Sequence, residues 1–305
     1  MRLHSFLRNW FCGLLAVGLF ATGRVRRARK RVLGSEVITP LYFHNPNKRL
    51  FARCIRWLER HGYTFVSSDD LIEILYNGKP IPKGAVWLSF DDGYKEWLEN
   101  VAPVVRQRRV PVTFFIPSGI VENDGRLPWM HRGNGSGAEL KGGRDTITLA
   151  ELRRVARYPE VTIGAHTVNH TVTANLPEEE ARYEFGHCQR TLESWTGREV
   201  KCFAYPEGRF DGGEKRMLCE FGYRLAAVTT SDFITRDTDP YLAPRLCIGD
   251  DISFAEAVCN MVGVWRPALD SVKKIFATLK PRSRAGDASA PIKSFPKPTE
   301  EAKWN

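Results

Sequence analysis

The sequence predicts an α/β fold in which parallel strands alternate with helices. Its 305 residues and 43% apolar content are enough for one large domain with a sizeable core. From residue 37 onward, short apolar runs of strand character alternate with amphipathic stretches of helical length. Because helices of this length connect parallel strands, the pattern indicates βαβ units, and hence an α/β barrel or an open doubly wound sheet.

The individual elements follow from apolar periodicity and turn signals. Strands are expected at 37–43, 64–66, 85–90, 112–116, 161–165, 201–205 and 224–228. Helices are expected at 48–61, 68–76, 94–108, 149–157, 177–196, 213–221 and 254–279. The segment 117–145 interrupts this rhythm with seven glycines. We interpret it as a binding loop above a strand end or as a disordered insertion, and Trp129 within it favours docking against a surface.

The net charge of +10 is concentrated at the two ends of the chain. Residues 1–31 hold eight Lys or Arg and no acid, residues 273–305 hold eight basic and three acidic residues, and the middle is slightly acidic. A nucleic-acid-binding domain would carry its basic residues on a folded face, so we expect no nucleic-acid partner.

Seven scattered cysteines without a Cys-x-x-Cys pair argue against a disulfide framework and favour a reducing compartment.

The first 34 residues are expected to form a membrane-associating leader. An apolar run at 10–21 is followed by six cationic residues between 24 and 31. The run is shorter than the roughly 20 residues of an ordinary membrane span, and a basic cluster directly behind it opposes export. We therefore expect a cytoplasmic protein anchored by this leader to an anionic membrane surface. An export signal leading to the periplasm or cell surface, and a merely frayed leader, are the alternatives.

Two adjacent acids, Asp91 and Asp92, follow the strand predicted at 85–90. Burying neighbouring carboxylates is costly unless a cation or a proton offsets their charge. The pair therefore suggests a metal site or a proton-transfer site. The alternative is structural, with Asp92 capping a helix that begins at Tyr94.

Two histidines, His166 and His170, follow the strand predicted at 161–165. Residues four apart face the same way on a helical turn, so the two imidazoles can hold one metal ion. Alone, such a pair is weak evidence, because histidines at this spacing often have structural roles. Combined with a carboxylate from 91–92, they give the two-His, one-carboxylate set of an open metal site. The acid that does not bind the metal is then free to act as a base.

Three segments together resemble the signature motifs of the polysaccharide deacetylases, the NodB-homology carbohydrate esterases of family four. They are Ser-Phe-Asp-Asp-Gly at 89–93, His-Thr-Val-Asn-His at 166–170 and Phe-Ala-Tyr-Pro-Glu-Gly at 203–208, in the order of the family. The similarity covers roughly residues 37–250. It implies a distorted, incomplete (β/α) barrel that hydrolyses the acetamide of an N-acetylated sugar with the help of a metal ion.

The resemblance also implies roles for the motif residues. Asp91 would be the general base, and Asp92, His166 and His170 would be the ligands of one divalent ion. Zinc suits this donor set best, and cobalt, nickel or iron also fit. The backbone amide of Glu207 would donate to the oxyanion that forms during hydrolysis.

Three positions depart from the pattern of the family. Ala204 stands where the family has an arginine that orients the base, and Arg245 is our candidate replacement, a surface arginine being the alternative. Glu207 replaces the tyrosine of the third motif. A late Leu-x-x-His motif, which would supply the general acid, is absent. A subset of the family carries a Tyr-x-His-like segment on its first strand, so His44 is the candidate acid, with a structural histidine as the alternative.

The sequence thus predicts a leader at 1–34, a deacetylase catalytic domain at 35–253, a C-terminal helix at 254–280 and a disordered tail at 281–305. The expected function is removal of N-acetyl groups from a polysaccharide or glycan precursor, with the glycan and an anionic membrane surface as partners. No protein partner can be named. The alternatives are a hydrolase of the same fold acting on an O-acetyl or another C–N bond, and a catalytically inactive glycan-binding barrel.

Overall fold

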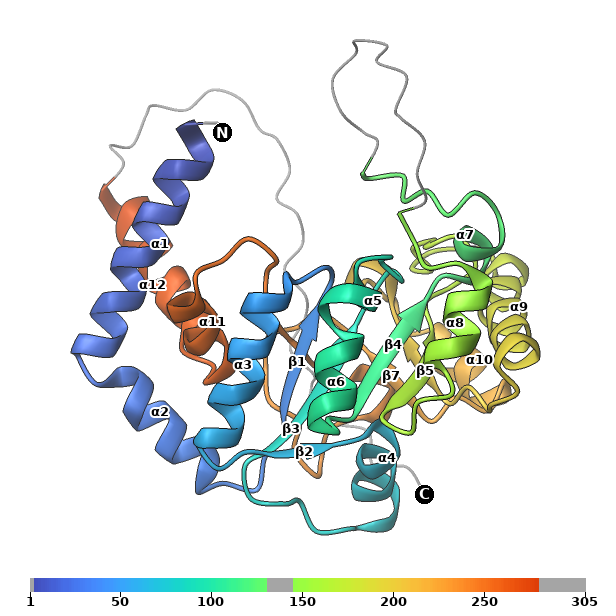
Figure 1. Cartoon of the computed structure of the whole chain (residues 1–305), viewed down its shortest axis with the longest axis horizontal. Coiled ribbons are helices and arrows are strands. Elements are labelled where there is room, and N and C mark those ends of the chain that lie inside the picture. Colours follow the sequence, from blue (N-terminus) through green and yellow to red (C-terminus); the bar gives the residue numbers. More distant parts are fainter. Residues whose placement is uncertain (1–2, 131–144, 280–305) are drawn as a thin grey trace. The chain divides into compact units, whose positions relative to one another are not determined.

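Eight strands form a curved sheet at the centre of the protein, as the computed structural model shows (Figure 1). The structure describes residues 3–130 and 145–279. All strand pairs are parallel, in the order β7-β6-β5-β4-β3-β1-β8, with β2 beside β3. The strands are β1 Thr39–Phe43, β2 Thr64–Val66, β3 Ala85–Phe90, β4 Val112–Ile116, β5 Val161–Ala165, β6 Cys202–Ala204, β7 Leu225–Ala227 and β8 Leu246–Cys247.

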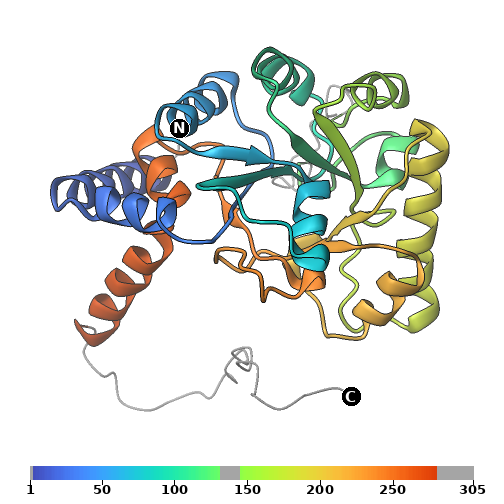
Figure 2. The ribbon, with the colours of Figure 1, turned by 90° about the horizontal axis from the view of Figure 1, so that it is seen from below.

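Helices surround this sheet, as the view in Figure 2 shows. Strands β1, β3 and β4 are buried along their whole length, as expected of parallel strands that are covered on both faces. The helices are α1 Leu3–Ala21, α2 Arg24–Leu33, α3 Lys48–Arg60, α4 Ser68–Asn77, α5 Trp97–Asn100, α6 Ala102–Arg108, α7 Ser118–Glu122, α8 Leu149–Val155, α9 Glu178–Thr196, α10 Glu214–Glu220, α11 Phe254–Met261 and α12 Trp265–Leu279.

The two ends of the sheet approach each other at one narrow contact. Ala243, just before β8, forms an isolated parallel bridge with Ala227 of β7, and the Ala243 carbonyl accepts a hydrogen bond of 2.9 Å from the amide of Val228. Two residues later, the amide of Arg245 donates to the carbonyl of Thr230 at 2.9 Å. The sheet is therefore curled into an incomplete barrel with a short seam, which confirms the predicted fold class.

Two predicted helices are each split in the structure. The helix expected at 94–108 is divided into α5 and α6, because Pro103 in the first turn of α6 lacks the amide proton needed to continue a helix. The helix expected at 254–280 is divided into α11 and α12. Between them, Gly263 has φ +72°, and a Cβ there would lie 2.6 Å from the Phe233 ring. Both predictions of a single continuous helix are therefore wrong.

The chain ends differ in how far the structure describes them. The segment 1–34, which the sequence predicts to be a membrane-associating leader, contains α1 and α2. In the described part of the chain we find no helix with the length and apolar character needed to cross a bilayer. Of the described residues, those up to 268 form one compact unit and 269–279 belong to a second. The tail expected at 281–305 lies outside the described residues, so its predicted disorder stays a prediction.

Candidate active site

The edge formed by the carboxyl ends of the strands brings together Asp92, His166 and His170. Asp92 follows β3 and His166 follows β5, with β4 between these two strands. The Nε2 atom of each histidine lies 3.4 Å from the same atom, Asp92 Oδ1. One ligand atom from each residue falls within 4.8 Å of the other two. The three side chains predicted to bind a metal thus meet at one point.

The hydrogen bonding of these residues fits a metal ion. Asp92 Oδ1 is buried and has no hydrogen-bond partner among the described residues, which is costly for an anionic oxygen unless a cation lies next to it. His166 Nδ1 lies 2.7 Å from the carbonyl oxygen of Ala204. Because a carbonyl only accepts, Nδ1 carries the proton, and in the neutral ring Nε2 offers its lone pair toward Asp92.

The two imidazoles differ in their tendency to hold a proton. Burial and the neighbouring His166 lower the pKa of His170 to about 4, so His170 is neutral at pH 7. Burial also disfavours the charged form of His166, but the nearby carboxylates of Asp92 and Asp91 outweigh it and raise the pKa of His166. A bound cation would favour the neutral form of both rings, which is the form that binds metal.

The turn that carries the two histidines is not the helical turn expected from their spacing. Thr167 and His170 have φ values of +62° and +57°, which a helix does not allow. Helix α7 packs against one side of this turn, where Gly119 donates its amide to the carbonyl of Val168 at 2.7 Å. A Cβ on Gly119 would lie 2.6 Å from Val168 Cγ1, so this close approach requires glycine.

Helix α9 holds the same turn from the other side through Glu184. The carboxylate of this buried residue accepts a hydrogen bond from the Val168 amide at 2.6 Å and another from Thr171 Oγ1 at 2.8 Å. The turn is therefore fixed by side-chain and backbone contacts rather than by helical hydrogen bonds. Nothing in the sequence predicted Glu184, because a glutamate within a long amphipathic helix looks like part of its solvated face.

Asp91 forms a two-point ion pair with Arg245. Nη1 and Nη2 of Arg245 lie 2.7 Å and 2.8 Å from the two carboxylate oxygens of Asp91. Burial alone would raise the pKa of Asp91, but the charge and hydrogen bonds of Arg245 lower it below its ordinary value. Asp91 is therefore ionised although it is buried. It lies next to the cluster formed by Asp92, His166 and His170, called the Asp92 cluster below.

Arg245 reaches this position because it lies at the barrel seam and points inward. Its side chain is completely buried, and its Nε donates to the carbonyl of Val228 at 3.1 Å. The guanidinium carbon lies 4.4 Å from the ring centre of Tyr42, which adds a cation–π contact. Nη1 also donates to Ser89 Oγ at 3.2 Å. The alternative of a surface arginine is excluded.

An open cavity of about 580 Å³ lies over the Asp92 cluster. His44 and Glu207 both line it. His44 is half-buried, and Glu207 has a side chain that is 61% exposed and lies 3.8 Å from Arg209 Nη1. The carboxylate of Glu207 is therefore turned toward solvent. We find no hydrogen bond from the Glu207 amide to another described residue.

Trp129, Tyr94 and Asp250 also line this cavity, and of these three the sequence indicates only Trp129 as a docking residue. The Trp129 ring centre lies 4.4 Å from that of His170, and its Nε1 donates to the Tyr94 hydroxyl at 3.0 Å. Burial raises the pKa of Asp250, which accepts a hydrogen bond from the Asn45 amide at 2.8 Å. Asp250 could have been found by the reasoning applied to Asp91, since it too is an acid that closely follows a strand.

Backbone strain is concentrated at this cavity. Six non-glycine residues have positive φ in the part of the chain that the structure describes. Four of them belong to the site, namely Asp92, Thr167, His170 and Glu207. Strained backbone persists where the surrounding structure holds it in place, and it is common at functional sites.

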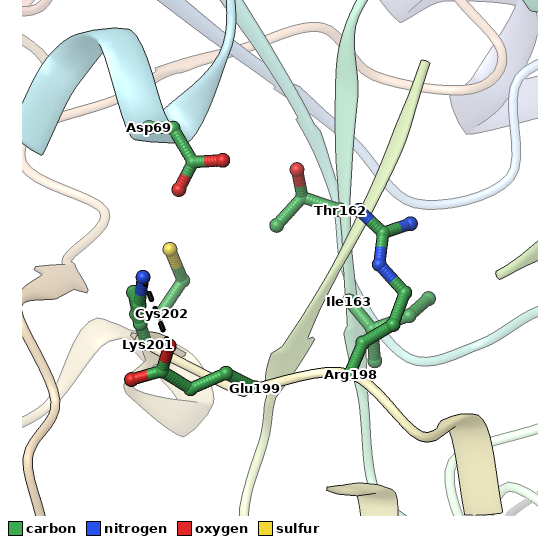
Figure 3. A pocket seen from close by; sticks show the side chains of 7 residues that line it. All are labelled: Asp69, Thr162, Ile163, Arg198, Glu199, Lys201 and Cys202. Carbon is green, nitrogen blue, oxygen red and sulfur yellow. Dashed lines mark ion pairs between the residues drawn. The ribbon is translucent and has the colours of Figure 1, made fainter. Parts of the chain in front are cut away.

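A second cavity, of about 260 Å³, lies at the amino ends of β5 and β6 (Figure 3). Three of its four charged side chains are already paired within the protein. Lys201 Nζ lies 3.0 Å from the Glu199 carboxylate, and Arg198 Nη1 donates to the carbonyls of Ala156 and Val161 at 2.8 Å. The fourth, Asp69, is exposed to solvent, and we assign this cavity no function.

Fold and site together define a barrel hydrolase with a buried Asp–His–His group at the carboxyl ends of its strands. Residues 78–226 match the polysaccharide deacetylase family model, which confirms the resemblance to this family that the sequence motifs indicated. The matched range contains Asp91 and both histidines of the cluster. It includes neither His44 nor Arg245.

Comparison with known proteins agrees with this assignment. The chain is 23% identical over 228 residues to a poly-β-1,6-N-acetyl-D-glucosamine N-deacetylase of Staphylococcus aureus, with 69% of this chain and 73% of the relative covered. Its fold is similar to that of the Streptococcus pyogenes deacetylase PplD (TM-score 0.62, 20% identity, 74% and 98% covered). It is also similar to that of IcaB from Ammonifex degensii (TM-score 0.59, 19% identity, 75% and 98% covered).

Proposed function

We propose that the protein removes N-acetyl groups from an N-acetylated polysaccharide by metal-dependent hydrolysis. The observation that carries this proposal is the Asp92–His166–His170 cluster, two of whose members line one open cavity, with the buried, ionised Asp91–Arg245 pair directly beside Asp92. The Staphylococcus aureus relative is named for poly-β-1,6-N-acetyl-D-glucosamine, which makes this polymer the first substrate to test.

Asp92, His166 and His170 would hold the metal ion. A divalent ion bound there would polarise the acetamide carbonyl and acidify the attacking water. Two imidazoles and one carboxylate suit zinc best, with cobalt, nickel and iron as the other candidates.

The remaining residues move protons and stabilise charge. Asp91 takes the proton of the water whose oxygen attacks the acetyl carbonyl carbon, and Arg245 keeps Asp91 anionic and oriented for this step. The Glu207 amide donates to the oxyanion formed at that carbon. His44, in its protonated form, gives its proton to the sugar nitrogen as the C–N bond breaks. The products are acetate and a free amino sugar.

Hydrolysis of an O-acetyl ester by the same groups is the second candidate. The observation behind this candidate is that Ala204 and Glu207 differ from the usual third motif of the family. The two reactions differ in their product, because one leaves a free amine on the sugar and the other a free hydroxyl. Labelling the product with an amine-selective reagent therefore distinguishes them.

The direct test is acetate release from β-1,6-linked N-acetylglucosamine oligomers by the purified protein and by Asp91→Asn. Loss of the base should lower kcat by roughly 10²–10⁴-fold while the metal content stays the same. Asp69→Asn is the matched control, because Asp69 is an exposed acid on α4 that does not line the cavity over Asp92. A fully active Asp91→Asn variant would overturn the assignment of the base, and a wild-type protein without bound metal or acetate release would overturn the function.

A further inference from the structure

Helix α1 exposes a stripe of large apolar side chains. The exposed fractions of Trp10, Leu14 and Val17 are 62%, 52% and 62%. Their spacing of four and then three residues places them on one face of the helix. Phe11 and Phe20, which are 39% and 43% exposed, border this face. Folded proteins seldom leave such a contiguous apolar surface in water unless it binds something.

The opposite face of α1 is already in use. Cys12, Ala16 and Leu19 are buried, and α1 packs against α11. Arg8 adds an ion pair with Glu256 of α11 at 4.0 Å. The helix is therefore attached to the barrel by one face while the other stays exposed.

Helix α2 continues this surface with positive charge. Arg24, Arg26, Arg27, Lys30 and Arg31 are exposed, whereas Val25 and Val32 are buried against the protein. No acidic residue occurs before Glu36. The outer surface of α1 and α2 thus combines an apolar stripe with a purely cationic helix.

We propose that α1 and α2 form an interfacial binding surface for an anionic lipid bilayer. Helix α1 lies in the plane of the membrane, with Trp10, Leu14 and Val17 at the boundary of the acyl chains. The cations of α2 contact lipid phosphates, each contributing attraction near a negatively charged membrane. A second copy of the chain fits this surface less well, because it would bring an equally cationic helix to it.

This inference is independent of the reaction proposed above, because it concerns where the barrel is held. The protein then meets its glycan at a membrane surface, held by α1 and α2 lying on the bilayer rather than across it.

The test is co-sedimentation of the full chain with vesicles. Vesicles of phosphatidylcholine mixed with phosphatidylglycerol should bind the protein, and added salt should weaken this binding. Vesicles of phosphatidylcholine alone should bind much less, because they lack the negative charge that attracts α2.

Two sets of variants separate the apolar and electrostatic parts. The triple change Trp10→Ser, Leu14→Ser and Val17→Ser should weaken binding at least about tenfold, because it removes the apolar surface that enters the bilayer. The pair Arg26→Gln and Arg31→Gln should weaken binding to anionic vesicles by about 30-fold at low salt.

Matched controls remove the same kinds of group elsewhere. Tyr183→Ser removes an exposed aromatic ring from α9, and the pair Arg108→Gln and Arg109→Gln removes two exposed charges at the end of α6. Both should bind vesicles like the wild type. All four variants should release acetate from soluble oligomers at the wild-type rate, which keeps the membrane test separate from the catalytic one.

Three results would overturn the proposal. The first is wild-type binding by the triple serine variant. The second is equal binding to neutral and anionic vesicles. The third is a stable dimer in solution that the triple serine variant dissociates, which would identify a second copy as the occupant of the surface.

Discussion

Arg245 and Asp91 form an ion pair in which each residue satisfies the buried charge of the other. Arg245 is 0% exposed, and both of its terminal nitrogens bind the carboxylate. A buried carboxylate left alone would hold a proton, and a protonated Asp91 could not accept one from water. At the residue scale, the basicity of the site therefore depends on a guanidinium contributed by a distant part of the chain.

Replacing Arg245 should change the pH dependence of the reaction. With Arg245→Lys, the two-point contact is lost, so burial of Asp91 is less well offset and its pKa rises. The acid limb of the kcat/KM profile should then shift to higher pH. Arg245→Ala should in addition lower the free energy of unfolding by about 3–5 kcal/mol, because it leaves a buried charge without a partner.

The sign of the stability effect follows from the lowered pKa of Asp91. In the wild type, the pair stabilises the fold above the ordinary aspartate pKa, and this contribution is lost as the pH falls through the lower pKa of folded Asp91. Kinetic pH profiles and urea unfolding at several pH values measure both effects. Arg224→Lys, at an exposed arginine directly before β7, is the control. An unshifted acid limb in Arg245→Lys would show that another group sets it.

At the scale of the element, the turn at 166–170 gains its shape from the two helices that hold it. Gly119 of α7 and Glu184 of α9 bond to the same residue, Val168, through its carbonyl and its amide. His166 and His170, which we propose as metal ligands, are thus positioned by residues outside the Asp92–His166–His170 cluster. Such supporting contacts commonly affect metal affinity strongly.

Glu184→Gln should weaken metal binding by roughly 10–100-fold. The amide keeps the size of the side chain, but it cannot accept both hydrogen bonds with the strength of a carboxylate. Titration of the metal-free protein with zinc measures this directly, and circular dichroism checks that the fold persists. Glu180→Gln, an exposed change on the same helix, should leave the affinity unchanged. Equal affinities in both variants would reduce Glu184 to a purely structural residue.

The sequence predicted the parts of the fold and site that depend on local pattern. The alternation of strands and helices is visible in apolar periodicity, and the acids and histidines stand directly after strands. The shape of the histidine turn was mispredicted, because a spacing of four residues suggests a helical turn whereas packing from α7 and α9 imposes positive φ. The burial of Glu184 was equally invisible, since it depends on contacts across the fold.

At the scale of the whole molecule, the cluster joins two separate strands and should link metal binding to stability. Asp92 follows β3, whereas His166 follows β5. A ligand that binds only the folded state stabilises it by an amount that grows with the ratio of ligand concentration to Kd. Metal bound at this point would therefore resist the separation of these strands.

Removing the metal with a chelator should lower the unfolding temperature. At a metal concentration about 1,000 times Kd, the loss is about 4 kcal/mol, which corresponds to a shift on the order of 10 °C for a domain of this size. Differential scanning calorimetry with and without chelator measures the shift. Asp92→Asn should respond little to the chelator, since it lacks the carboxylate ligand. An equal response in this variant would place the stabilising ion elsewhere.

The seam between β7 and β8 also affects the order in which the site can assemble as the chain is synthesised. Asp91 and Arg245 are 154 positions apart in the chain, and the segment that matches the family model ends at residue 226. A ribosome that has synthesised this whole segment has not yet supplied the guanidinium that keeps Asp91 ionised. A barrel that does not yet include Arg245 and β8 therefore lacks the two-point contact that holds Asp91 ionised, and we expect it to be inactive in the proposed reaction until this strand is in place.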